Sequence, residues 1–309
     1  MVHQRRMGGW CQTNVLLVTA VVRSYNRAEY LREALDSVLG QTRPPDQVLV
    51  VDDGSTDATP DVLAAYSVEV LRLQHTGNPA AVLNAGLRAA RGDLVALLDS
   101  DDVWLPDKLA RQVRLFADPG VGFVYGNVCV LFADGRRSEP VLRADQIVNG
   151  CLLPTLVRNM CVHPSTLMVR REWLAPVDEA ERVNEDFFLL LRLARMTAAA
   201  CVPEPVALIR QHAGMVSTDH GLAAYTAAIR ALSSLVDDPS VSRKVRLSAH
   251  RSIGRYHTHV AKALLEQHAI AEARQHAVAA LLNHPLHRPA WRWAAIAAIR
   301  SLSRPAQSP

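Results

Sequence analysis

Apolar runs and helix-like segments alternate along the first hundred residues. Each run is short and rich in β-branched and aliphatic side chains, which is typical of strands buried on both faces of a parallel sheet. The segments between them keep apolar residues at helical spacing, and the first has Asn26 and Glu29 placed as in an N-terminal capping box. The alternation predicts β-α-β units and a right-handed parallel sheet. The strands are predicted at 15–22, 47–51, 68–73 and 94–98.

The pattern changes after a helix predicted at 105–117. Short apolar runs then indicate strands of a mixed sheet, with one helix at 185–194 among them. These strands are predicted at 122–125, 128–132, 164–169, 198–202 and 205–209. Beyond about Gly221 the sequence is rich in alanine and keeps helical spacing to its end. The predicted divisions are an N-terminal extension at 1–14, an α/β domain at 15–218 and a helical C-terminal region at 219–309.

Composition narrows the class of protein. The 309 residues are 49% hydrophobic, so the chain can bury a large core and is not disordered over most of its length. A net charge of +4 is too small and too dispersed for a nucleic-acid-binding protein. No apolar run approaches the roughly 20 residues of a membrane span, and the run 15–22 continues into Arg23 as a strand and not as a signal peptide. Five widely spaced cysteines without a C-x-x-C pair disfavour disulfides and structural zinc, and favour a reducing cytoplasm.

Acidic turns follow the second and the fourth predicted strand, at 52–55 and 99–102. Ligands bind at the carboxyl ends of strands in such sheets, so both turns are expected to open on one edge. The three carboxylates of the second turn repel one another unless a cation lies among them, and Mg²⁺ or Mn²⁺ bound with substrate phosphates suits that composition. Each turn alone also fits an ordinary loop before a helix.

A third acidic pair, Glu185 and Asp186, begins the helix predicted at 185–194. A carboxylate there suits a general base that takes a proton from an acceptor hydroxyl. The same residues also suit the first turn of any helix, where they favour the helix dipole.

Taken together, these segments resemble family 2 glycosyltransferases, in order and at the family's spacing, over about 15–218. The matching segments lie at 25–31, 37–42, 50–57, 84–87, 90–92, 98–109, 185–193 and 209–212. The resemblance implies a GT-A fold, which is a Rossmann-like, mainly parallel mixed sheet flanked by helices, here with an all-helical C-terminal extension. It also implies an inverting transfer that depends on Mn²⁺ or Mg²⁺, from a nucleotide-diphosphate sugar to a hydroxyl of a glycan or lipid-linked acceptor, as in bacterial polysaccharide biosynthesis. Uridine is the favoured base, and thymidine stays open.

The resemblance assigns roles to named residues. Asp186 would be the catalytic base, with Glu185 beside it in a supporting role. Asp53 would contact the nucleobase, with Tyr25 near its ring and Ser24 close by.

The metal side follows in the same way. Asp101 would hold the metal, and Asp99 would face the ribose or the metal. His212 would lie near the diphosphate and the metal, where a neutral imidazole is compatible with Mn²⁺.

Two positions depart from the family's pattern. Arg23 stands where the family usually has Pro, and Leu83 stands where an Arg that helps to hold the phosphates is common. We expect Arg23 to take over phosphate binding, because a guanidinium suits phosphate oxygens. The departures favour an alternative, a degenerate scaffold that binds a nucleotide sugar without transfer. The intact acidic residues Asp99, Asp101, Glu185 and Asp186 oppose it. A dinucleotide oxidoreductase is disfavoured, because no G-x-G-x-x-G follows the first strand.

The sequence pattern says less about the roles of the acceptor side and of the C-terminal helices. Residues 133–183 are expected to line the acceptor side. No Asp or Glu follows Glu272, and the helical segment 286–304 carries an apolar face with arginines beside it. Such a helix suits an anionic membrane surface, and equally suits packing on its own domain or on another subunit. We expect a cytoplasmic protein, and we leave open both a peripheral contact at the inner face of the membrane through 286–304 and the oligomeric state.

Overall fold

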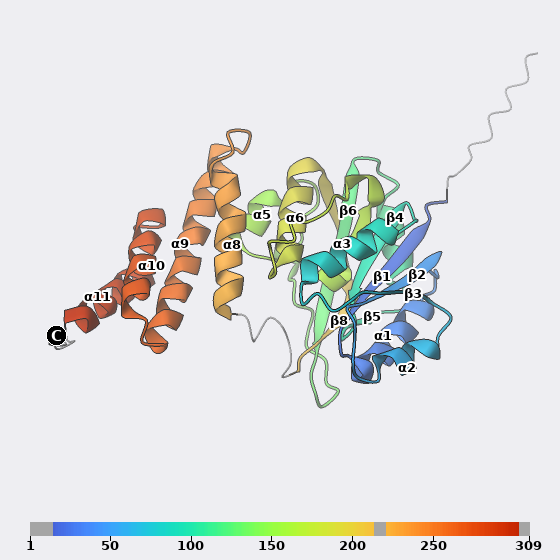
Figure 1. The fold of residues 1–309 in the computed structure, drawn as a ribbon. Coiled ribbons are helices and arrows are strands. Elements are labelled where there is room, and N and C mark those ends of the chain that lie inside the picture. The colour runs from blue at the N-terminus through green and yellow to red at the C-terminus, as the bar shows by residue number, and fades with distance from the viewer. Residues whose placement is uncertain (1–14, 213–220, 303–309) are drawn as a thin grey trace, which may run out of the picture.

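The computed structural model describes residues 15–212 and 221–302, and side chains as far as 298. The predicted extension at 1–14 lies outside the described residues. A mixed sheet forms the centre of the α/β part, in the order β3-β2-β1-β4-β7-β6-β8-β5, and helices cover both of its faces (Figure 1). The fold class expected from the sequence is confirmed.

The first half of the sheet is parallel, as predicted. Its strands are β1 (Val18–Ser24), β2 (Gln47–Asp52), β3 (Glu69–Arg72) and β4 (Leu94–Asp99). Alternating side chains of β1 reach opposite layers: Val21 packs with α3 (Pro79–Ala89) and Val22 with α1 (Ala28–Leu39). A Cβ at Gly86 would lie 2.6 Å from Cγ1 of Val21, so this glycine lets α3 approach β1 closely.

The second half of the sheet is simpler than predicted. The two strands expected between 122 and 132 form one strand, β6 (Val121–Leu131), and those expected between 198 and 209 form β8 (Ala198–Arg210). The two run parallel with register shifts on either side of Asn127, so a local bulge and not a chain break separates the apolar runs. The strand expected at 164–169 is divided into a 3-10 turn and β7 (Met168–Arg170).

The predicted N-cap of α1 is wrong. Asn26 has a positive φ of 49°, and its side chain accepts from the backbone N–H of Thr56 at 2.8 Å. The carboxylate of Asp57 accepts instead from the N–H of Ala28 at 3.1 Å. The first turn of α1 is thus capped from the loop after β2, which places Asn26 between the two strand ends.

The chain beyond 221 is helical, as predicted, and its first two helices share the main core. Ala231 and Leu232 of α8 and Ile253 of α9 belong to the same buried cluster as the sheet side chains Val21 and Leu97. Helices α8 and α9 therefore pack on the α/β part and are not an independent unit (Figure 1). No helix among the described residues is long and apolar enough to span a membrane. The helices from here on are α8 (Gly221–Val236), α9 (Arg243–Glu266), α10 (Ile270–Asn283) and α11 (Arg288–Leu302).

The remaining elements are short. They are α2 (Thr59–Ala64), β5 (Val103–Trp104), α4 (Lys108–Leu115), η1 (Ala144–Gln146), α5 (Leu153–Arg158), η2 (Pro164–Thr166), η3 (Arg171–Trp173) and α6 (Glu185–Met196).

Candidate active site

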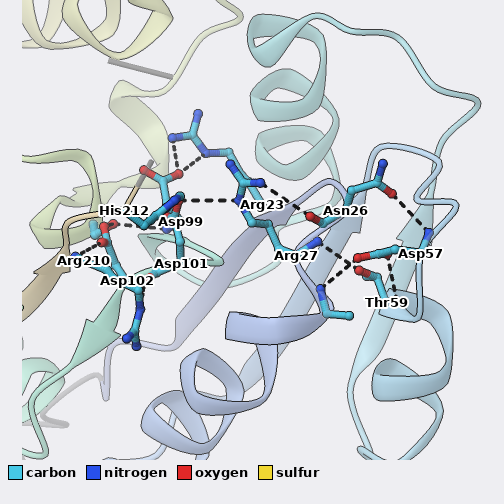
Figure 2. Close-up of polar contacts among 12 residues, drawn as sticks. Arg23, Asn26, Arg27, Asp57, Thr59, Asp99, Asp101, Asp102, Arg210 and His212 are labelled. Atoms are coloured by element: carbon cyan, nitrogen blue, oxygen red, sulfur yellow. Dashed lines mark hydrogen bonds and ion pairs between the residues drawn. The ribbon is translucent and has the colours of Figure 1, made fainter. Parts of the chain in front are cut away.

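The acidic turns predicted to share an edge do meet, around the end of β1. Arg23 is in register with Asp99 of β4, and Ser24 is in register with Asp52 of β2. The backbone N–H of Asp53 donates to the carbonyl of Ser24 at 2.9 Å. Figure 2 shows Asp99 and Asp101 on one side of this strand end, and Asn26 with Asp57 on the other.

Arg23 lies at the centre of the acidic groups. Its Nε and Nη2 donate to Oδ1 of Asp99 at 3.0 and 2.5 Å, and its Nη1 lies 2.5 Å from Oε1 of Glu185. The side chain is only 11% exposed. Burial alone would lower the pKa of Arg23, but the charges of Asp99, Glu185 and Asp186 raise it above its ordinary value. Arg23 is therefore a permanent buried cation that joins β4 to the start of α6.

The third acidic pair occupies the first turn of α6. Asn184 precedes the helix with φ 61°, and its side chain donates to the carbonyl of Ala224 in α8 at 2.8 Å. Burial and then the charge of Glu185 raise the pKa of Asp186 to about 7, against the opposing effect of Arg23. Asp186 can thus take up or release a proton near neutral pH, whereas Glu185 is held by Arg23.

Asp101 and His212 form a pair beside Asp99. Oδ2 of Asp101 lies 3.1 Å from Nε2 of His212 and 3.7 Å from Nε of Arg27. No group of three or more His, Cys, Asp or Glu placed to hold a metal occurs among the described residues. A carboxylate and an imidazole nevertheless fit Mn²⁺ or Mg²⁺ in a site that substrate phosphates complete. Both hydrogen bonds from Arg23 go to Oδ1 of Asp99. No described residue donates a hydrogen bond to Oδ2 of Asp99.

Asp102, the remaining acid of the second turn, is structural. Its Oδ2 accepts from Oγ of Ser165 at 2.5 Å, and its Oδ1 accepts from the backbone N–H of Arg210 at 3.0 Å. Burial and then the charges of Asp99 and Asp101 raise the pKa of Asp102 well above its usual value. This carboxyl group ties β8 to the turn after β4 and so positions the segment that ends in His212.

The predicted base-binding residues lie at the other side of the strand end. Oδ1 of Asp53 accepts from the backbone N–H and Oγ1 of Thr76 at 2.9 and 2.8 Å, and its Oδ2 accepts from the N–H of Gly77 at 3.1 Å. The ring of Tyr25 stacks on His75 with centroids 4.1 Å apart. His75 and Thr76 were not foreseen from the sequence, although the rule that function follows strand ends applies to the loop after β3.

Ser24 carries an unusual hydroxyl. Its Oγ is buried and makes no hydrogen bond within the part of the chain that the structure describes. A buried hydroxyl without a partner costs free energy, which a polar ligand atom would recover. The hydroxyl of Ser24 is therefore suited to form a hydrogen bond with a polar ligand.

Leu83 belongs to the apolar core and does not face the acidic residues. Leu83 is fully buried in the main core, whereas the next residue, Asn84, exchanges two hydrogen bonds of 2.8 Å with the backbone of Val177. A charged side chain at 83 would be buried among apolar groups.

A cavity of about 510 Å³ lies between the segment that precedes α6 and the first turns of α8. It is formed by the segment just before Asn184 and by the exposed side of α8. Its lining residues are Ala180, Arg182, Val183, Leu222, Ala223, Thr226 and Arg230. The end of the segment 133–183, which is expected to line the acceptor side, thus borders a hollow just before α6 in the chain.

Comparisons with known proteins agree with this arrangement. The family model described as "Glycosyl transferase family 2" matches residues 19–176. The chain is 34% identical over 210 residues to the succinoglycan biosynthesis protein ExoO of Rhizobium meliloti, a match that covers 62% of this chain and 59% of ExoO. The chain thus spans less than two thirds of that relative.

Solved structures show the same fold. Residues 1–349 of S. aureus TarS superpose with a TM-score of 0.65 at 16% identity, over 94% of this chain and 93% of that one. The mannosyltransferase PcManGT of Pyrobaculum calidifontis, in complex with GDP-Man and Mn²⁺, superposes with a TM-score of 0.61 at 21% identity, over 94% and 88% of the two chains.

Proposed function

The chain belongs to glycosyl transferase family 2 and is a glycosyltransferase, and from this premise we propose that it moves a sugar, with inversion, from a nucleotide-diphosphate donor to a hydroxyl of a glycan or lipid-linked acceptor. One observation carries the proposal. The acids Asp53, Asp101 and Asp186 come from three distant parts of the chain, yet all lie around the end of β1, with Arg23 joining Asp99 to Glu185.

The donor's base fits between Tyr25, His75 and Asp53. Stacked rings provide a face for a planar base, and the backbone bonds from Thr76 and Gly77 fix the carboxylate of Asp53. The hydroxyl of Ser24 and the Oδ2 of Asp99 are then placed for the polar groups of the nucleotide. UDP-sugars are the first candidates.

The diphosphate belongs beside Asp101 and His212. A divalent cation held there would neutralise the charge that develops on the departing nucleotide. The chain's own residues orient it: Asp102 positions the turn, and Arg23 contributes the positive charge that the family's usual arginine would give from position 83.

Asp186 serves as the base. In its ionised form it accepts the proton of the acceptor hydroxyl while that oxygen attacks the anomeric carbon from the face opposite the nucleotide, which inverts the configuration. The cavity lined by Arg182 and Val183, which precede α6, and by Leu222 of α8 would supply room for the acceptor.

The setting is polysaccharide biosynthesis, because the relative ExoO is a succinoglycan biosynthesis protein. A cytoplasmic enzyme with contact at the inner membrane surface through 286–304 would meet a lipid-linked acceptor there.

A donor panel tests the proposal. Thermal unfolding of the full chain is measured with UDP-, dTDP- and GDP-sugars, with and without Mn²⁺. Hydrolysis is then followed for the nucleotide sugar that stabilises the protein against unfolding. Stabilisation that needs Mn²⁺, together with slow hydrolysis, supports a transferase. Stabilisation without any turnover would instead favour a binding module on a degenerate scaffold.

A further inference from the structure

A cavity of about 630 Å³ between α5 and α9 is lined by cations. Arg158 comes from α5, and Arg243, Lys244 and Arg251 come from the first three turns of α9. All four side chains are exposed, whereas Val245 and the half-exposed Leu247 provide apolar surface between them. Cationic rims around an apolar base suit an anionic group that is attached to an apolar body.

The charge of this cavity is not compensated by the chain itself. Within 15–212 and 221–302, none of the four cations forms an ion pair with a carboxylate. The sole acid in α9 is Glu266 at its far end, where it lies near Lys262. Positive potential therefore gathers at the start of this long helix.

Large apolar side chains are exposed at the neighbouring turn between α10 and α11. Leu282 is 79% exposed, Leu286 is 88% exposed and Trp291 is 58% exposed. The arginines Arg288 and Arg292 are exposed beside them. Leucine, tryptophan and arginine together are the residues that interfacial helices present to lipid.

The cavity and this turn are neighbours. Burial and then the charges of Arg251 and Arg255 lower the pKa of His284, which lies in the turn. A Cβ at Gly254 would lie 2.6 Å from Cβ of His284, so the middle of α9 packs directly on the turn. Arg251 thus belongs to both features.

We propose that the cation-lined cavity and the α10–α11 turn form one docking surface for a bilayer with anionic headgroups. Phosphate groups would pair with the rim formed by Arg158, Arg243, Lys244 and Arg251, while Leu286 and Trp291 enter the interface. A soluble polyanion would leave these apolar side chains in water, and a second copy of the chain would bring cations against cations. The inference deepens the membrane contact of the proposed function and rests on it.

Vesicle flotation of the full chain tests this surface. Vesicles of phosphatidylcholine alone are compared with vesicles that also contain phosphatidylglycerol, at low and at high salt. We expect binding only to the anionic vesicles, weakened by salt. Each lost cation should weaken binding roughly fivefold, so R243Q/K244Q should show a large loss, and Leu286→Ser a loss of roughly tenfold.

Matched variants on the α/β part provide controls. Arg114→Gln removes an exposed cation of α4, and Val141→Ser removes a half-exposed apolar side chain. Both should bind vesicles as the parent does. Donor hydrolysis without vesicles should be unchanged in every variant, which separates this surface from the proposed transferase function.

Binding of soluble heparin or inorganic polyphosphate without binding to anionic vesicles would overturn the proposal. Equal loss in the control and the test variants would overturn it as well. Failure of donor hydrolysis in the parent, with vesicle binding intact, would count against the transferase and not against the docking surface.

Discussion

Arg23 Nη1 lies 2.5 Å from Oε1 of Glu185, across 162 positions of sequence. This ion pair distinguishes two adjacent acids at the start of α6. Glu185 pairs with the buried cation. Oδ1 of Asp186 instead accepts the N–H of Phe187, and burial raises the pKa of Asp186 to about 7. The pair thereby leaves Asp186 as the carboxyl group that exchanges protons near neutral pH.

Replacing Arg23 by Met should disturb both activity and stability. Removal of the cation leaves the buried carboxylate of Glu185 and the partly exposed carboxylate of Asp99 without their partner, and loss of one partner of a buried pair costs about 3–5 kcal/mol in the free energy of unfolding. Since Arg23 lowers the pKa of Asp186, its loss should raise that pKa and move the acidic limb of the pH profile of kcat/KM upward.

The conservative variant Arg23→Lys separates charge from geometry. Arg23→Lys should restore much of the stability and return the acidic limb of the kcat/KM profile toward its parent position. It should not restore the two hydrogen bonds from the guanidinium to Asp99. A merely structural role would lower stability without moving the limb. Donor affinity of Arg23→Ala at low salt tests phosphate binding separately, and an unchanged affinity would remove that role.

Transfer should decline as the pH falls through about 7, because the base works only when it is ionised. Asp186→Asn should lower kcat by roughly 10²–10⁴-fold while donor binding stays intact. The pH–rate profile of the parent and isothermal titration of the variant with donor are the measurements. Normal turnover by Asp186→Asn would show that another group is the base.

The same substitution should affect stability in a pH-dependent manner. A carboxyl group whose pKa is higher in the folded than in the unfolded chain favours the folded state when protonated, so this contribution is lost as pH rises from about 4 to about 7. Asp186→Asn avoids that loss. Its midpoint of thermal unfolding should exceed the parent's at about pH 8, and the gap should shrink toward about pH 5.

His75→Ala should weaken donor binding through the lost ring stack on Tyr25. Stacking of a base on an aromatic ring contributes about 1–3 kcal/mol, so KM for the donor should rise about tenfold or more, with kcat little changed. His259→Ala is the matched control, because His259 also stacks on a tyrosine, Tyr225, but in the helical region. A similar KM for both variants would contradict the placement of the base.

The parallel half of the fold follows from sequence because its signals are local. Continuous apolar runs and helical spacing indicated β1 to β4 and the helices between them within a few residues. Asn26 shows the limit of such signals. It has the residue type of an N-cap, but Asp57 supplies the cap from the next loop, a contact that spacing within one helix does not reveal.

In the site, too, local signals predicted some features, whereas features that depend on tertiary contacts were not predicted. The strand-end rule placed Asp53 and Asp99 on one edge, and both do lie there. It did not separate Asp101 from Asp102, since their difference arises from Ser165 and the backbone of Arg210, more than 60 positions away. The link between Arg23 and Glu185 is likewise tertiary, so no local pattern in the sequence indicated this ion pair.

Removal of either proposed metal ligand should abolish stabilisation by Mn²⁺. Oδ2 of Asp101 and Nε2 of His212 lie 3.1 Å apart, and a carboxylate and an imidazole at this spacing can bind one ion that substrate phosphates complete. In the presence of UDP, Mn²⁺ should raise the midpoint temperature of thermal unfolding of the parent, but not that of Asp101→Asn or His212→Ala. Asp61→Asn, at an exposed acid of α2, should behave as the parent does. A shift by Mn²⁺ that survives in Asp101→Asn would place the ion elsewhere, because the anionic carboxylate is the harder of the two proposed ligands.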